Sequence, residues 1–223
     1  MSDLKRIMSQ VTRNFLLLAL DDYLAARLLL RNGLLPQGTA LAATSVEKHL
    51  KAVLALNDVF TKKHLGCSGL VALVRKDHSA LAAALNRDFM KFLDRAFRMR
   101  YASVDGPGFN MVLNQHRTLI ELDRTMMEID SGFKVEGVKR LDATPFREAV
   151  QSRKELLCED NVPLGSISLE ELTARKNKMY EIRVAEKLRT LTVEYETDTL
   201  NIVGDFCKSS DIDYKGTFSL ALG

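Results

Sequence analysis

The clearest pattern of hydrophobic and polar positions lies between residues 41 and 57, in the segment LAATSVEKHLKAVLALN. Apolar residues recur there at steps of three and four, and polar residues fill the other side: Ala43, Val46, Leu50 and Val53 against Thr44, Glu47, Lys48 and Lys51. This period is typical of an amphipathic helix with one buried face. Because alanines on that face allow a second helix to approach closely, we expect this helix to be the centre of a bundle.

The same periodicity predicts helices on both sides of this segment. Up to Phe133 it defines five helices, at residues 14–31, 41–57, 68–75, 78–101 and 110–130. Asn32-Gly33 is a typical C-terminal cap for the first helix, and Pro36-Gln37-Gly38 is expected to form the turn into the second. Residues 1–13 also carry apolar positions at helical spacing, so they either extend the first helix or fray. The first helix is expected to bury one side and to expose the other: Leu17, Leu20, Leu24 and Leu28 against Asp21, Asp22, Arg27 and Arg31.

The pattern changes beyond residue 133. A helix is predicted over 146–158, with Pro145 in its first turn, where a missing backbone N–H is tolerated. Ser168 and Glu171 form a capping box, which predicts a further helix to about residue 188.

From Leu191 onward, apolar and polar residues alternate, which predicts short strands or an extended arm that includes Leu200 and Ile202. The predicted fold class is therefore mainly α. We expect an up-and-down five-helix bundle over residues 1–133 and a smaller α+β or extended C-terminal region over residues 134–223.

Composition restricts the range of functions. A chain of 223 residues with 46% hydrophobic residues can bury one core, or one core and a small appendage. The net charge of +3 and the pI near 8.7 are too mild to indicate nucleic-acid binding over the whole surface, so a basic site would have to be local. The three cysteines are far apart and form no C-x-x-C pair, which argues against a disulfide framework and a structural zinc site.

The apolar runs predict neither a membrane span nor an export signal. The longest one in the N-terminal half, 15–20, is far shorter than the roughly 20 residues that cross a bilayer, and Asp21 and Asp22 end it. We expect a cytoplasmic protein with no membrane contact.

Four segments resemble the HEPN domain, named for higher eukaryotes and prokaryotes nucleotide-binding. They are DDYLAARLLL at 21–30, TSVEKHLKAVL at 44–54, KKHLGCSGLVALV at 62–74 and FRMRY at 97–101. The resemblance covers residues 14–133 and implies a helical bundle that often forms homodimers. Members of this family include ribonucleases of toxin–antitoxin and defence systems. Others are non-catalytic, and are paired with minimal nucleotidyltransferases or thought to bind nucleotides.

The histidines distinguish between these two kinds of member. The resemblance implies that a ribonuclease would carry an arginine, four to six intervening residues and a histidine near the start of the last helix. None of the four histidines has an arginine at that spacing: His49, His64, His78 and His116. We therefore expect no catalytic residues and lean against enzyme activity. We also expect no cofactor and no metal, because no two histidines share a helix turn.

Cations provide the candidate binding site. Arg87, Lys91, Arg95 and Arg98 follow one another at steps of four, four and three, so they share one side of a helix. Such a stripe suits phosphate or a polyanion, and it also suits a solvated face paired with neighbouring carboxylates. Arg100 adds a further charge, and Tyr101 either stacks on a base or closes the end of the bundle.

Two lysines of the central helix complete the candidate set. With Glu47, Lys48 and Lys51 match polar positions of the family, which makes all three candidates for contact with a ligand or a second subunit. An ordinary helical ion pair between Glu47 and Lys51 explains the second lysine equally well.

Three functional hypotheses follow. The first is a non-catalytic, dimeric HEPN-like module of a toxin–antitoxin or defence-type system that binds a nucleotide or RNA and has a nucleotidyltransferase as a possible partner protein. The second is a structural or regulatory protein-interaction module that uses the C-terminal strands to hold another protein. The third is a divergent ribonuclease built from Arg98, Arg100 and His116.

Overall fold

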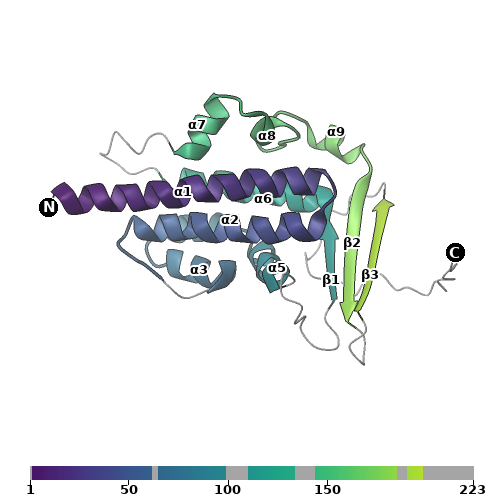
Figure 1. Cartoon of the computed structure of the whole chain (residues 1–223), viewed down its shortest axis with the longest axis horizontal. Helices are drawn as coiled ribbons and strands as arrows, with labels where there is room; N and C mark the ends of the chain where they lie inside the picture. Colours follow the sequence, from purple (N-terminus) through teal and green to yellow (C-terminus); the bar gives the residue numbers. More distant parts are fainter. Residues whose placement is uncertain (1, 62–64, 99–109, 134–143, 185–189, 198–223) are drawn as a thin grey trace, which may run out of the picture.

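A computed structural model describes residues 2–61, 65–98, 110–133, 144–184 and 190–197. The chain begins with two long antiparallel helices, α1 (Ser2–Arg31) and α2 (Leu35–Ala55) (Figure 1). Residues 2–13 extend the first predicted helix rather than fray. The predicted turn at Pro36-Gln37-Gly38 is wrong, because these residues lie in the first turn of α2, where proline is tolerated. Gly38 is needed there, since a Cβ would lie 2.8 Å from the Cγ of Leu30.

Helix α2 is the central element, as the sequence predicted. The four apolar residues that define its pattern are almost completely buried: Ala43, Val46, Leu50 and Val53. Helices α1, α3, α5 and α6 all contact it. The alanine-containing face therefore lies inside the bundle, where close helix approach is required.

The predicted helix 78–101 is interrupted. The structure has α3 (Gly66–Val74), α4 (Ser79–Ala84) and α5 (Arg87–Arg98), and Leu85 between the last two is extended, with ψ 133°. The side chain of Asn86 then accepts hydrogen bonds from the backbone N–H groups of Asp88 and Phe89, at 3.0 and 3.2 Å. This is an N-cap, and it starts a new helix with its own direction. Residues 99–101 lie outside the described residues.

The last helix of the bundle starts later than predicted. Asn110–Asn114 form strand β1, and α6 runs over Gln115–Ser131. The side chain of Asn114 caps α6 by accepting a hydrogen bond from the backbone N–H of Arg117, at 3.0 Å. The prediction that residues 110–114 are helical is wrong because a distant strand pairs with them.

The C-terminal region contains three short helices and two strands. The helices are α7 (Pro145–Gln151), α8 (Glu155–Cys158) and α9 (Leu169–Thr173). The predicted helix 146–158 is interrupted at Arg153, which has a left-handed φ of 51°. The capping box of Ser168 and Glu171 is present, but its helix ends at Thr173 instead of near residue 188.

A small antiparallel sheet replaces the remainder of that predicted helix. Its strand order is β1, β2 (Asn177–Val184) and β3 (Thr190–Thr197), so β2 pairs with both neighbours. Strand β3 confirms the strand predicted from Leu191, whereas Leu200 and Ile202 lie outside the described residues. The fold is thus mainly helical with a small sheet, as predicted.

The C-terminal elements are packed on the bundle. Helices α7 and α8 lie along α1, on the side opposite α3 and α5, and the sheet lies at the end where α1 turns into α2 (Figure 1). Phe146, Leu157 and Ile182 belong to the same apolar core as the helices of the bundle. The division of the chain at residue 133 stays a prediction.

Candidate functional site

Helix α5 separates apolar from cationic side chains. Five of its apolar residues are buried and Phe97 is half-buried; the buried ones are Phe89, Met90, Phe92, Leu93 and Ala96. Arg87, Lys91 and Arg98 are exposed and Arg95 is half-buried. We call these four residues the α5 cation stripe. The two other predicted members of the site, Arg100 and Tyr101, lie outside the described residues.

Two carboxylates accompany the α5 cation stripe. Asp88 lies 3.4 Å from Lys91, in an exposed pair of the kind that contributes little to stability. Asp94 is directed at the N-terminus of α3, where it accepts hydrogen bonds from the backbone N–H groups of Cys67 and Ser68. With four cations and two carboxylates, α5 keeps an excess of positive charge.

The two predicted lysines of α2 each have an acidic partner. The Nζ atom of Lys48 lies 2.6 Å from Asp22 on α1, and that of Lys51 lies 2.6 Å from Glu47 on its own helix. Lys48 is therefore held toward α1. Lys51 is connected through Glu47 to a cavity that Arg98 also lines.

This cavity, of about 210 Å³, lies where α2, α3 and α5 meet, and we call it the α3 cavity. Among the described residues, those that line it are Ala43, Glu47, Leu65, Gly66, Cys67, Asp94, Phe97 and Arg98. Gly66 begins α3 with a left-handed φ of 68°, which brings the first N–H groups of the helix onto Asp94. Burial, together with the nearby charges of Asp94 and Glu47, raises the pKa of the Cys67 thiol well above its ordinary value.

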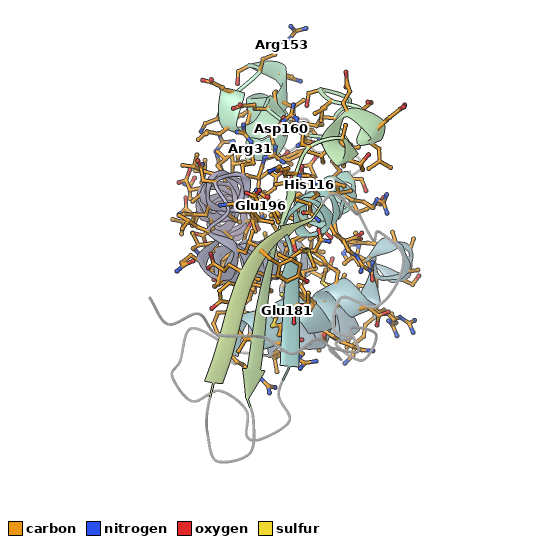
Figure 2. All side chains as sticks on the ribbon, turned by 90° about the vertical axis from the view of Figure 1, so that its right-hand side faces the viewer. Arg31, His116, Arg153, Asp160, Glu181 and Glu196 are labelled. Atoms are coloured by element: carbon orange, nitrogen blue, oxygen red, sulfur yellow. The ribbon has the colours of Figure 1, made fainter. Side chains whose placement is uncertain are left out.

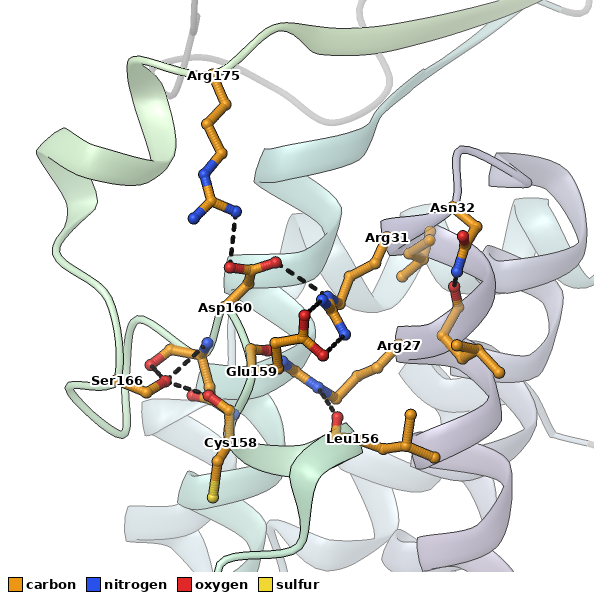
Figure 3. Close-up of polar contacts among 12 residues, drawn as sticks. Arg27, Arg31, Asn32, Leu156, Cys158, Glu159, Asp160, Ser166 and Arg175 are labelled. Atoms are coloured by element: carbon orange, nitrogen blue, oxygen red, sulfur yellow. Dashed lines mark hydrogen bonds and ion pairs between the residues drawn. The ribbon is translucent and has the colours of Figure 1, made fainter.

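A buried polar network joins α1 to the C-terminal helices. Arg27 is 0% exposed, forms an ion pair with Asp123 of α6, and donates to the carbonyl oxygens of Leu156, at 2.9 Å, and Glu159 (Figure 3). The hydroxyl of Tyr23 donates to the second oxygen of Asp123 at 2.7 Å. The sequence placed Arg27 on the polar side of the first helix and gave no signal that α8 would cover it.

A second ionic cluster lies one turn further along α1. Arg31 contacts Glu159 at 2.7 Å and Asp160 at 3.0 Å, and Arg175 contacts the other oxygen of Asp160 at 2.7 Å (Figure 3). Burial alone would raise the pKa of Asp160, but hydrogen bonds from Arg31 and Arg175 lower it below its ordinary value. An open cavity of about 760 Å³ adjoins this cluster, and Arg153 and Arg175 are among its lining residues.

His116 lies near this second cluster, at the start of α6. Figure 2 looks onto the end of the molecule on which His116, Asp160 and Arg31 are labelled. The residue is 5% exposed, and its Nδ1 atom has no hydrogen-bond partner in the described part of the chain. Burial and the charge of Arg175 lower the pKa of this histidine. Arg98 instead lines the α3 cavity, so the structure does not bring these two members of the predicted ribonuclease site together.

The other histidines and the cysteines have local roles or lie elsewhere. His49 is buried with its Nδ1 atom 2.9 Å from the carbonyl oxygen of Ser45, and His78 contacts Asn57 at 2.8 Å. His64 and Cys207 lie outside the described residues. Within the described ranges, no group of three or more histidine, cysteine or acidic residues is arranged to hold a metal ion.

In the part of the chain that the structure describes, no helix combines the length and the apolar character that a membrane span needs.

Comparison with known proteins identifies the family. The family model described as the HEPN domain matches residues 12–127, which correspond to α1 through most of α6. Neither the curated proteins nor the solved structures gave a match. The matched region includes the central helix, the α5 cation stripe and the α3 cavity. The chain belongs to the HEPN domain family, and at the family level it is a nucleotide-binding or ribonuclease-like module.

Proposed function

We propose that this protein is a non-catalytic HEPN module that binds a nucleotide or RNA through the α5 cation stripe. The observation that carries the proposal is the arrangement of α5, which buries most of its apolar side and presents Arg87, Lys91 and Arg98 on the outside. Arginine and lysine side chains spaced along a helix bind successive phosphates through charge-assisted hydrogen bonds. The absence of the family's arginine–histidine spacing supports binding without catalysis.

The family is our basis for proposing an oligomeric state, a biological system and a partner protein. We propose a cytoplasmic homodimer of a toxin–antitoxin or defence-type system, with a nucleotidyltransferase as a candidate partner protein. Three exposed leucines of α1, Leu17, Leu18 and Leu28, supply apolar surface that a second subunit would cover.

The test is RNA binding by the full chain as a function of salt. Single-stranded RNA is titrated by fluorescence anisotropy at several salt concentrations. The double variant Arg87→Gln/Lys91→Gln is expected to bind at least about tenfold more weakly at low salt, and its slope of log K against log salt falls by about 1.4, since each phosphate contact on a single strand contributes about 0.7. Both residues are exposed, so the variant is expected to fold normally.

A matched control removes the same charge elsewhere. Arg124 and Lys176 are 62% and 74% exposed, and the variant Arg124→Gln/Lys176→Gln is expected to keep the wild-type slope. Equal slopes for both double variants, or no RNA binding by the wild type at low salt, would overturn the proposal.

One observation favours ribonuclease activity as the second candidate function. His116 has a buried Nδ1 atom that finds no hydrogen-bond partner among the described residues and lies near the positive charge of Arg175, an arrangement that suits proton transfer beside a phosphate. Incubation with structured and single-stranded RNA tests it. The non-catalytic proposal expects intact RNA, whereas cleavage that disappears in His116→Ala would establish the second candidate in its place.

A further inference from the structure

Asp160 connects two arginines that belong to different parts of the chain. Arg31, at the end of α1, donates from Nε to one carboxylate oxygen at 3.0 Å, and Arg175, which follows α9, donates to the other oxygen at 2.7 Å (Figure 3). We call these three residues the Asp160 bridge. Two guanidinium groups hold a phosphate in the same way, since a phosphate also presents two charged oxygens to them. The carboxylate of Asp160 therefore occupies a position that suits an anionic ligand.

The Asp160 bridge borders an open cavity. Asp160, Arg175 and Arg153 all line the cavity of about 760 Å³. The side chain of Arg175 is 55% exposed, whereas those of Arg31 and Asp160 are 16% and 17% exposed. A ligand in the cavity therefore reaches Arg175 directly, and it reaches Arg31 when the carboxylate moves aside. The volume lies in the range of sites that hold small organic ligands, so a nucleotide unit fits.

The charges around the cavity disfavour a polyanion while Asp160 is in place. Among the described residues, the lining has four carboxylates and two arginines: Glu155, Glu159, Asp160 and Glu171, and Arg153 and Arg175. Glu159 pairs with Arg31, and Glu171 accepts the backbone N–H of Ser168 in the capping box. Asp160 is the carboxylate that two arginines share, so its displacement exposes two guanidinium groups at once.

His116 lies beside the Asp160 bridge. Burial and the charge of Arg175 lower the pKa of His116, whereas the charge of Asp160 raises it, so both groups are close to the ring. The buried Nδ1 atom of this ring finds no hydrogen-bond partner among the described residues. Buried polar atoms of this kind are rare in native structures, because each one costs free energy. A phosphate oxygen at the bridge would provide a partner in this neighbourhood.

We propose that Arg31 and Arg175 form a phosphate-binding site, which Asp160 closes by acting as an internal substitute for the phosphate. The site goes beyond the proposed function, because it lies on the side of the bundle opposite α5 (Figure 1), and Asp160 and Arg175 lie outside the family match at residues 12–127. A phosphate group opens the site by displacing the carboxylate. The carboxylate belongs to the same chain and competes at a high effective concentration, so the wild type binds phosphate weakly there.

Asp160→Asn tests the proposal, because it removes the charge of the internal competitor. Asp160 has a left-handed φ of 55°, which asparagine also adopts, and thermal melting checks that the variant is folded. Binding of single-stranded RNA to the full chain is measured by fluorescence anisotropy at several salt concentrations. The variant is expected to bind at least about threefold more tightly than the wild type at low salt, and its slope of log K against log salt is expected to steepen by about 0.7, the contribution of one phosphate contact.

Glu148→Gln is the matched control for the change in net charge. It removes one carboxylate from an exposed pair with Arg13, at a position that does not line the cavity. Salt screens such an exposed charge, so this variant is expected to change the RNA affinity by less than about twofold and to keep the wild-type slope. Equal gains in Asp160→Asn and Glu148→Gln would overturn the proposal.

A second substitution assigns the gain to the Asp160 bridge. Arg175→Gln in the Asp160→Asn background is expected to return the affinity and the slope to their wild-type values. Arg124→Gln in the same background removes an equal charge from an exposed residue of α6, so it is expected to keep the gain. If both substitutions abolish the gain equally, the gain reflects net charge and the proposal fails.

The phosphate belongs either to RNA or to a free nucleotide, and calorimetric titration with ATP distinguishes these sources. A gain of Asp160→Asn over the wild type with RNA alone assigns the site to the polymer. A gain with ATP, lost on addition of Arg175→Gln, assigns the site to free nucleotides. If folded Asp160→Asn gains affinity for neither probe, the inference is wrong.

The same titrations separate this site from the α5 cation stripe. In the Arg87→Gln/Lys91→Gln background, Asp160→Asn is expected to give the same fold-increase in affinity as in the wild type. A gain that requires Arg87 and Lys91 would assign the added contact to the stripe and contradict the inference. If Arg87→Gln/Lys91→Gln keeps the wild-type slope while Asp160→Asn still gains affinity, the proposed function fails and the Asp160 site stands.

Discussion

Replacement of Asp123 by alanine is expected to lower the free energy of unfolding by about 3–5 kcal/mol, because it leaves the guanidinium of Arg27 buried without its counter-charge. The two side chains are 0% and 1% exposed, so water cannot solvate the remaining charge. Urea denaturation of the full chain, followed by circular dichroism, measures the loss.

The effect is expected to reach beyond the ion pair. Arg27 also donates to the carbonyl oxygens of Leu156 and Glu159, and Tyr23 donates to Asp123. If Arg27 moves toward water, its hydrogen bonds to these two carbonyl oxygens break. Helix α8 then loses this attachment to α1. Limited proteolysis of Asp123→Ala is expected to cut first in the region of α8.

Glu148→Ala is the matched control. Glu148 of α7 pairs with Arg13 of α1 at 3.6 Å, so it also joins the C-terminal helices to α1, but both side chains are nearly half exposed. Its loss is expected to cost less than about 1 kcal/mol. A similar small loss for Asp123→Ala would show that the buried network does not hold the two parts together.

Arg27 also illustrates the limit of the helical pattern. Periodicity identified the apolar side of α1 only in part, since Leu20 and Leu24 are buried whereas Leu17 and Leu28 are 42% exposed, and it assigned Arg27 to the solvent. The assignment is wrong because α8, about 130 residues later, supplies carbonyl acceptors for the guanidinium. The hydrophobic pattern of one helix identifies its apolar face. It contains no information on a distant segment that covers the polar face.

Strands β1 and β2 were missed for a related reason. The stretch that became β2 has the alternating charges of an exposed helix, and its strand conformation depends on simultaneous pairing with β1 and β3. Pairing of this kind overrides intrinsic preference. In contrast, the start of α9 was predicted correctly, because a capping box is a local interaction between Ser168 and Glu171.

The candidate site likewise contains one feature that a local pattern predicts and one that it does not. The spacing of the α5 cation stripe is a property of one helix, and the structure places its exposed members on the side away from the core. The α3 cavity needs Glu47, Cys67 and Arg98 from three helices, and nothing in the spacing of these residues indicated that they would meet. Glu47 and Arg98 each had a separate signal, Glu47 as the polar neighbour of Lys51 and Arg98 as a member of the α5 cation stripe.

A second large effect is expected on acidification, and His49 is its source. The ring is 2% exposed inside the bundle, with Nδ1 at 2.9 Å from the carbonyl oxygen of Ser45. Burial lowers the pKa of His49 to about 4, against the raising effect of that hydrogen bond. In the unfolded chain its pKa returns to about 6.5.

The sign of the effect follows from proton binding. Above pH 6.5, His49 is neutral in both the folded and the unfolded protein. Its contribution to the free energy of unfolding therefore does not change with pH in that range. Between about pH 6.5 and 4 the unfolded state binds a proton that the folded state excludes, so the free energy of unfolding falls as the pH falls. At about 1.4 kcal/mol per pKa unit, the loss reaches about 3 kcal/mol at pH 4.

Urea denaturation at pH 7 and pH 4 isolates this contribution when the wild type is compared with His49→Leu. The other acid-sensitive groups are common to both proteins, so their effects cancel in the difference. The stability advantage of the wild type over His49→Leu is expected to shrink by about 3 kcal/mol between the two pH values. Thr39→Val is the control, because it removes the 2.7 Å hydrogen bond to the carbonyl oxygen of Leu35 in the same helix without removing a titrating group. It is expected to cost about 1 kcal/mol at both pH values. If the difference between wild type and His49→Leu stays constant with pH, the burial of a neutral His49 is not a source of acid sensitivity.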